Sequence, residues 1–419
     1  MSHESSLIAT LALSLIAALI GALVAARLRL PQLVGYLLGG VLIGPFALRL
    51  VPSTHLAQEI AEVGVIQLMF GVGLHFSIRE LLTMPILAFA GAVLQMVVAT
   101  SLGTALAYSW GWSLGGALVF GLALSVASTV VLLRALQTDG TLGSEAGRIA
   151  VGWLLAEDLV TVLILVILPA FAGVLGQAPG ADVTAKSSHL GDILAVVGIT
   201  LAKVAAFIAA MLLAGKRILR WVLKRVEQVG SDELLVTALG AIALGVAYCA
   251  VKVFDASFAL GAFAAGLVLN ESDLGKPAAK HLHTLENALV VLFFVAVGML
   301  FDPRILAQEP LRVLAVLAVI VIAKSLTAFA VVLLFRNSVT TALTIAACLT
   351  QIGEFSFILA GLGISLRLLP PEGLNLIVAG ALFSIAINPL VFRLARALKR
   401  GTCVPTAEAR GKCIDAVSS

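Results

Sequence analysis

Charge is scarce in this sequence. Only 12% of its 419 residues are Asp, Glu, Lys or Arg, while 61% are hydrophobic. Soluble domains carry roughly 25% charged residues, so this composition excludes an ordinary soluble protein. It predicts an all-α polytopic membrane protein. With most of the chain in lipid, a pI near 9.0 does not indicate nucleic-acid binding, and we expect no nucleic-acid partner.

Cysteines are also few. The four cysteines, Cys249, Cys348, Cys403 and Cys413, have the spacing of neither a disulfide framework nor a zinc site. A glycine-rich dinucleotide fingerprint in a strand–helix context is missing as well, which excludes a soluble nucleotide domain. We expect no metal site and no cofactor. No basic stretch precedes the apolar residues 6–26, so we interpret them as a spanning helix rather than a cleaved signal.

Long apolar runs are what the sequence has instead, and they predict about thirteen spans within a transmembrane domain at 1–400. Of the 27 Lys and Arg residues, 19 fall on one side of these spans and 6 on the other, while Lys203 and Lys324 lie within spans. The asymmetry places the N-terminus outside and the C-terminus in the cytoplasm. It makes 401–419 a short cytoplasmic tail and 216–229 an amphipathic cytoplasmic linker. The predicted spans are 6–26, 32–48, 58–77, 84–109, 113–136, 149–172, 191–214, 233–251, 256–271, 284–301, 311–335, 340–365 and 372–395.

The sequence contains an internal repeat. The segment VGLHFSIR at 72–79 resembles VGMLFDPR at 297–304, an offset of 225 residues. The offset pairs a first repeat at 58–172 with a second at 284–395. Seven spans separate equivalent positions, and because this number is odd the two copies have inverted topologies. Inverted repeats are typical of secondary transporters.

Polar residues interrupt two apolar spans at equivalent places in the repeats. One span contains LSVASTV at 124–130 and the other contains LTQIGEFS at 349–356. Interrupted helices at such positions offer main-chain carbonyls and helix ends to an ion near the middle of the bilayer. Hydroxyl groups such as that of Ser125 also serve as packing contacts between helices, and we keep this alternative open for Ser125.

Glu157 and Asp158 stand side by side within an otherwise apolar run. Adjacent residues on a helix point about 100° apart, so the two carboxylates face different partners. Lys324 lies near the middle of another span and needs a neutralising partner, for which one of these carboxylates is the simplest choice. The other is then free to hold a proton or a hard monovalent cation, with Ser128, Thr129 and main-chain carbonyls as neighbours.

Three other roles stay open at this stage. The Glu157–Lys324 pair has a structural alternative, in which it only fixes helix packing. Glu354 either caps the broken helix electrostatically or pairs with a basic residue such as Arg134. Lys203 has no assigned role.

Seven segments together resemble the membrane domain of bacterial Kef-type cation:proton antiporters (the cation:proton antiporter-2 family), and in particular its YbaL/RosB-like branch. The resemblance covers residues 30–395. The segments are GYLLGGVLIGP at 35–45, LMFGVGL at 68–74, ASTVVLLR at 127–134, ED at 157–158, SFALGAF at 257–263, FFVAVGM at 293–299 and QIGEF at 351–355.

The resemblance implies a sodium/proton antiporter-like fold with two crossed discontinuous helices, a homodimer embedded in membrane lipid, and elevator-like alternating access. It carries the ion and proton site over to Asp158 and the preceding acidic position to Glu157. The core lysine becomes Lys324, with a Glu157–Lys324 bridge. The broken-helix residues become Ser128, Thr129 and Glu354, with Gln351 beside them.

Two departures from the family pattern leave questions open. Potassium-type members commonly carry Gln before the Asp, and sodium-type relatives carry Asp-Asp or Asn-Asp, whereas this chain has Glu157-Asp158. Family members also usually carry a cytoplasmic nucleotide-binding regulatory domain, so either a regulatory domain or subunit is absent from this sequence, or the protein lacks that regulation.

We therefore expect a monovalent cation:proton antiporter of the bacterial inner membrane, with K⁺ ahead of Na⁺. The alternatives are a Na⁺/H⁺ antiporter and a gated cation channel of the same fold. An enzyme is not expected, because adjacent carboxylates on one helix cannot face each other across a substrate.

Overall fold

The computed structural model describes residues 3–75, 85–175, 190–254, 256–270 and 288–402. Every regular element in these ranges is helical, which confirms the predicted fold class. The helices are α1 (His3–Arg27), α2 (Gln32–Ile43), α3 (Thr54–His75), α5 (Ile86–Ser109), α6 (Leu114–Ser125), α7 (Thr129–Thr138), α8 (Glu145–Leu175), α9 (Leu190–Ala210), α10 (Lys216–Val229), α11 (Asp232–Phe254), α12 (Phe258–Asn270), a helix at Ala288–Met299, α14 (Ile305–Gln308), α15 (Pro310–Leu317), α16 (Lys324–Leu334), α17 (Val339–Cys348), α18 (Glu354–Ser365) and α19 (Pro371–Thr402).

The predicted number of spans is not reproduced one for one. Eight of the described helices are long and apolar enough to cross a membrane, and five shorter apolar helices accompany them. Two of the shorter ones, α17 and α18, are the halves of the single span predicted at 340–365. Two π-helical segments, η1 (Met211–Gly215) and η2 (Ala318–Ala323), join α9 to α10 and α15 to α16 without interrupting the rod.

The internal repeat is visible in how the helices begin. Pro85 precedes α5 and Pro310 begins α15, which are positions 225 residues apart. Ser113 and Ser338, also 225 apart, cap α6 and α17 by accepting a hydrogen bond from the main-chain N–H three residues on. Side-chain oxygens at this position satisfy N–H groups that the first helical turn leaves free. The same capping chemistry therefore recurs at the same place in each repeat.

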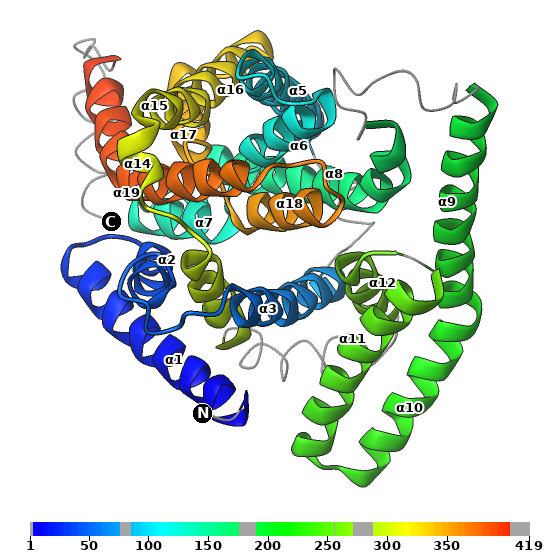
Figure 1. The fold of residues 1–419 in the computed structure, drawn as a ribbon. Coiled ribbons are helices and arrows are strands. Elements are labelled where there is room, and N and C mark those ends of the chain that lie inside the picture. The colour runs from blue at the N-terminus through cyan, green and yellow to red at the C-terminus, as the bar shows by residue number, and fades with distance from the viewer. Residues whose placement is uncertain (1–2, 76–84, 176–189, 255, 271–287, 403–419) are drawn as a thin grey trace.

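The helices fall into two groups (Figure 1). Helices α5–α8 and α15–α19 pack together, and both interrupted helices lie in this group, which we call the core group. Helices α1, α2, α3, α11 and α12 lie on the other side, where α3 packs against α12 and α1 against α2. The rod made of α9, η1 and α10 runs along one edge of the molecule.

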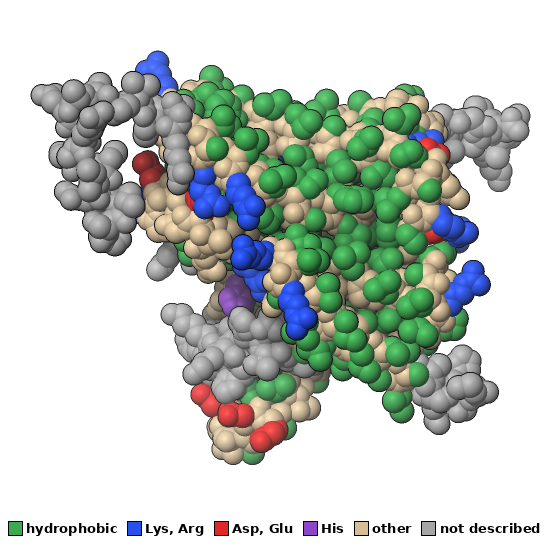
Figure 2. Space-filling view, turned by 90° about the vertical axis from the view of Figure 1, so that its left-hand side faces the viewer, with side chains coloured by type: hydrophobic (Ala, Val, Ile, Leu, Met, Phe, Trp, Pro, Cys, Tyr) green, Lys and Arg blue, Asp and Glu red, His purple; other side chains and the backbone are tan. Residues whose placement is uncertain are grey.

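The outer surface fits a lipid environment. Hydrophobic side chains cover the middle of one face, and Lys and Arg side chains lie mainly toward its margins (Figure 2). Leu19, Ile20 and Leu213 are among many large apolar side chains that stay more than half exposed. Together with the eight long apolar helices, this surface identifies a multi-pass membrane protein.

Two predictions at the chain's periphery have different outcomes. The segment 216–229 is amphipathic as predicted, but it is the regular helix α10 rather than a loop. In the predicted tail at 401–419, residues 401 and 402 continue α19, and the rest lies outside the described residues.

Candidate functional site

Two interrupted helices meet at the centre of the core group. The first breaks between Ser125, the last residue of α6, and Thr129, the first of α7. The second breaks between Cys348 at the end of α17 and Glu354 at the start of α18. A Cβ atom on Gly353 would lie 2.6 Å from Cα of Ser128, so only glycine permits this close approach of the two breaks.

Gln351 joins the two breaks through the main chain of Ser128. Its Oε1 accepts a hydrogen bond from the Ser128 N–H at 2.8 Å, and its Nε2 donates to the Ser128 carbonyl at 3.2 Å. The same Nε2 lies 3.2 Å from the carbonyl of Cys348, the last residue of α17. Gln351 is completely buried, so each of these bonds replaces hydration that the main chain has lost.

Other buried side chains satisfy the carbonyls that the breaks leave free. Nε2 of Gln95 on α5 donates to the Ser125 carbonyl at 3.2 Å. Nδ2 of Asn388 on α19 donates to the Ala347 carbonyl at 3.1 Å and to the Thr350 hydroxyl at 2.8 Å. The ends of α6 and α17 are therefore held by side chains, as helix ends away from water require.

Glu157 is completely buried, and both of its carboxylate oxygens have partners. Oε2 accepts from the N–H of Ala127, in the first break, at 2.9 Å. Oε1 accepts from Nε1 of Trp153, one helical turn earlier on α8, at 3.2 Å. The carboxylate of Glu157 is thus fixed between its own helix and the break, and it is not arranged to exchange ligands.

Asp158 has a different environment. The side chain is only partly buried, and its Oδ2 accepts a hydrogen bond from the Thr129 hydroxyl at 3.0 Å. Its Oδ1 is buried but has no hydrogen-bond partner in the part of the chain that the structure describes. Of the two adjacent carboxylates, Asp158 therefore has an oxygen left to bind a further ligand.

Lys324 does not form the direct ion pair with Glu157 that the family resemblance implies. Lys324 is completely buried and its Nζ donates to the Gln351 carbonyl at 3.0 Å, while no ion pair within 4 Å joins it to Glu157 among the described residues. The two charges interact only through space. The π-helical segment η2 ends directly before Lys324 and inserts an extra residue in the turn, which redirects the side chains that follow.

Glu354, at the start of α18, accepts a hydrogen bond from the Ser128 hydroxyl at 3.3 Å. Its carboxylate at a helix N-terminus fits the predicted electrostatic capping role. The alternative partner, Arg134, donates instead to Oε1 of Gln32 at 3.0 Å. Glu354 and Asp158 are also near enough to interact electrostatically, so three carboxylates share this region.

The structure thus brings together all seven residues singled out from the sequence: Ser128, Thr129, Glu157, Asp158, Lys324, Gln351 and Glu354. Three further contributors were missed, namely Gln95, Trp153 and Asn388. Gln95 and Asn388 are isolated amides in apolar spans, which is a signal that the sequence does carry. Trp153 counts as apolar, and only its position four residues before Glu157 hints at a hydrogen bond.

The oxygen atoms around Asp158 are suited to a hard cation. Carboxylate, hydroxyl and main-chain carbonyl oxygens are ligands that such ions prefer. No group of three or more His, Cys, Asp or Glu side chains arranged for a metal ion occurs in the described ranges, and His281 and His283 lie outside them.

Known proteins resemble this chain in sequence and in structure. Residues 14–395 match the family model described as "Sodium/hydrogen exchanger, transmembrane". The putative cation/proton antiporter YbaL of Escherichia coli is 55% identical over 395 residues, which are 94% of this chain and 69% of that protein. The K(+) efflux antiporter 4 of Arabidopsis thaliana is 30% identical over 394 residues, 94% of this chain and 64% of the plant protein.

Among solved structures, the sodium proton antiporter MjNhaP1 from Methanocaldococcus jannaschii has a TM-score of 0.61 at 17% identity. The similarity covers 93% of this chain and 97% of that one. At this identity the likeness concerns the fold. The family model spans nearly the whole chain, and the chain belongs to the sodium/hydrogen exchanger family.

Proposed function

We propose that this protein is a secondary active transporter that exchanges a monovalent cation for protons, with Asp158 as the group that binds each ion in turn. The observation that carries the proposal is the asymmetry of the Asp158 carboxylate. Oδ2 is held by the Thr129 hydroxyl, whereas the buried Oδ1 has no partner among the described residues. A proton or a cation would each satisfy Oδ1, but not both together. Mutually exclusive occupancy is sufficient for antiport.

The environment of Glu157 supports this division of roles. Because both Glu157 oxygens already accept hydrogen bonds, binding a cation there would break two buried contacts. Binding at Asp158 breaks none at Oδ1. The Thr129 hydroxyl can donate to the carboxylate in one state and turn a lone pair toward a cation in the other.

The transport cycle that we propose starts with Asp158 deprotonated and facing one side of the membrane. A cation binds to its carboxylate with help from Thr129 and main-chain carbonyls of the breaks. The core group then moves against the remaining helices, the cation leaves on the other side, and a proton takes its place. Both interrupted helices belong to the core group, so the site would travel as one unit in an elevator-type motion.

We propose K⁺ as the preferred cation and Na⁺ as the alternative. The plant relatives at 28–30% identity are named K(+) efflux antiporters, and each match covers at least 85% of this chain. The structure whose name specifies sodium is 17% identical, which supports the fold alone. We further propose a homodimer in a bacterial inner membrane, with the N-terminus periplasmic and the C-terminus cytoplasmic, on the basis of the Lys and Arg asymmetry.

The proposal is tested with purified protein in proteoliposomes that contain a pH-sensitive dye. Addition of K⁺ should dequench the dye in vesicles with the wild-type chain and have no effect with Asp158→Asn, while Asp302→Asn, which lies in a loop outside the site, should behave as wild type. Dye responses to Na⁺ and Li⁺ but not K⁺ would assign the sodium alternative. Retained exchange in Asp158→Asn would refute the assignment, and cation flux without any proton movement would identify a channel.

A further inference from the structure

The helix α10 presents a strongly basic face that the transport site does not use. Leu219, Leu223 and Val226 are the buried side of this helix, and α10 packs against α11. On the opposite side, Lys216, Arg217, Arg220, Trp221 and Lys224 line a shallow cavity of about 500 Å³ together with Leu212 and Leu213. We call these seven residues the basic face.

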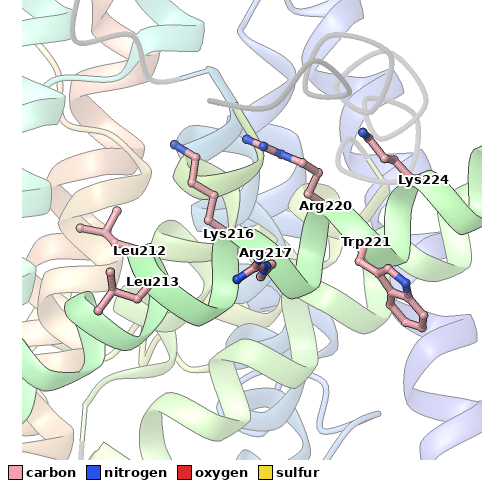
Figure 3. Close-up of a pocket in the computed structure, with 7 residues that line it drawn as sticks. All are labelled: Leu212, Leu213, Lys216, Arg217, Arg220, Trp221 and Lys224. Atoms are coloured by element: carbon pink, nitrogen blue, oxygen red, sulfur yellow. The ribbon is translucent and has the colours of Figure 1, made fainter.

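The charged side chains of the basic face act together. Lys216, Arg220 and Lys224 lie about one turn apart and extend in the same direction from the helix (Figure 3). Their spacing of four residues places them in one row along the helix. No acidic side chain is among the residues that line the cavity. The row therefore forms an anion-binding surface rather than a set of internal ion pairs.

The cavity also has an apolar end. Leu212 and Leu213 lie in η1, one turn before the first basic residue, and Leu213 is 79% exposed. Such exposure is favourable only in contact with lipid or a partner, because about 25 cal/mol is lost for each Å² of apolar surface in water. The change from leucines to basic residues within one cavity indicates that the boundary between acyl chains and headgroups crosses it here.

Trp221 supports the same boundary. Its ring is 60% exposed and the guanidinium of Arg225 lies 5.9 Å from the ring centroid. Tryptophan is enriched where acyl chains meet headgroups, since its ring is apolar and its N–H is polar. A basic segment that directly follows a spanning helix is also the arrangement that attracts anionic lipid.

We propose that the basic face binds the phosphate headgroup of an anionic phospholipid, with Arg217 and Arg220 on the phosphate and Leu212 and Leu213 against the acyl chains. Arginine suits phosphate because its planar guanidinium offers paired N–H donors. The site goes beyond the ion exchange proposed above and does not depend on it.

The test measures lipid binding by the full chain in detergent, by native mass spectrometry and by thermal unfolding, with phosphatidylglycerol, cardiolipin and phosphatidylcholine as probes. Wild-type protein should retain the two anionic lipids and unfold at a higher temperature with them, but not with phosphatidylcholine. Arg217→Gln/Arg220→Gln should weaken binding about 10- to 30-fold, since each basic residue near the surface contributes on the order of 1 kcal/mol.

Arg148→Gln/Arg393→Gln is the matched control, because it removes two exposed arginines from α8 and α19. This control should bind lipid as wild type does. Leu213→Asn separates a lipid from a soluble anion, since only a lipid has acyl chains that the leucine can contact. Equal binding by both double variants, an unchanged affinity in Leu213→Asn, or saturation of the effect by inorganic phosphate alone would overturn the proposal. Loss of the dimer with lipid binding intact would show that the face is a protein interface instead.

Discussion

Gln351 holds the main chain of Ser128 from both sides, accepting from its N–H at 2.8 Å and donating to its carbonyl at 3.2 Å. The two residues are 223 positions apart and belong to different repeats. This contact locks the two interrupted helices together where neither has its own helical hydrogen bonds. The site around Asp158 depends on it, because Thr129 follows Ser128 directly.

Gln351→Leu should lower stability. The substitution keeps the size of the side chain but leaves the buried Ser128 N–H without its acceptor, which costs about 1–3 kcal/mol. Thermal unfolding in detergent measures the loss. Gln67→Leu is the control, since Gln67 is equally deep but its Nε2 has no hydrogen-bond partner in the described chain. Similar unfolding temperatures for the two variants would show that the Gln351 bonds contribute nothing.

Lys324→Gln should be milder than Lys324→Met. The Nζ atom donates to the Gln351 carbonyl at 3.0 Å, and a glutamine amide can restore a donor there whereas methionine cannot. We expect Lys324→Met to be less stable than Lys324→Gln by roughly 1–3 kcal/mol, the penalty of a buried carbonyl without a partner. Thermal unfolding of the two variants checks this. Equal losses would mean that the positive charge near Glu157, and not the hydrogen bond, is what matters.

Asn388→Ala should destabilise the end of α17. Its amide donates to the Ala347 carbonyl and to the Thr350 hydroxyl, and both acceptors are buried. The expected loss is about 1–3 kcal/mol, with reduced exchange because α17 positions Gln351. Ser384→Ala, one turn earlier on α19, removes only a bond to the Ala381 carbonyl of its own helix, so it should be nearly neutral. Exchange assays and unfolding curves for both variants decide the matter.

The loop after the helix Ala288–Met299 gives a pH dependence with a defined sign. Hydrogen bonds from Arg304, the shortest at 2.7 Å, hold the pKa of Asp302 below its ordinary value. A carboxyl whose pKa is lower in the folded state stabilises the fold above its unfolded pKa, about 3.9, and loses that contribution as the pH falls through the folded value. Arg304→Gln should therefore unfold with a weaker dependence on pH between about 5 and 3.

The control for this experiment is Arg367→Gln, which changes an exposed arginine in another loop. Its unfolding temperature should follow the wild-type dependence on pH. A wild-type dependence in Arg304→Gln as well would remove the Asp302–Arg304 pair as the cause.

Most of the site was predictable because polar residues are rare in apolar spans. Each of Glu157, Asp158, Gln351 and Glu354 stands out against its neighbours, and the 225-residue offset correctly pairs Ser128 with Gly353 at the two breaks. Membrane burial makes every such residue expensive, so few of them are present by chance.

The contacts between these residues were not predictable to the same degree. Which group Lys324 reaches depends on the π-helical segment η2, and nothing in the apolar sequence 318–323 announces an extra residue in that turn. The hydrogen bond from Trp153 depends on a rotamer, since the side chain also packs against Gly91. Number and length of spans were also uncertain, because an interrupted helix and a continuous one have the same mean hydropathy.

The measurement that tests the account most directly is proton release on cation binding. Purified protein in lightly buffered detergent solution is titrated with K⁺ and with Na⁺ while the pH is recorded. If the cation and the proton compete for Asp158, the wild-type chain should release protons as the cation binds, and Asp158→Asn should release none. Proton release that persists in Asp158→Asn, or cation binding to the wild-type chain without any release, would contradict a shared site at this carboxylate.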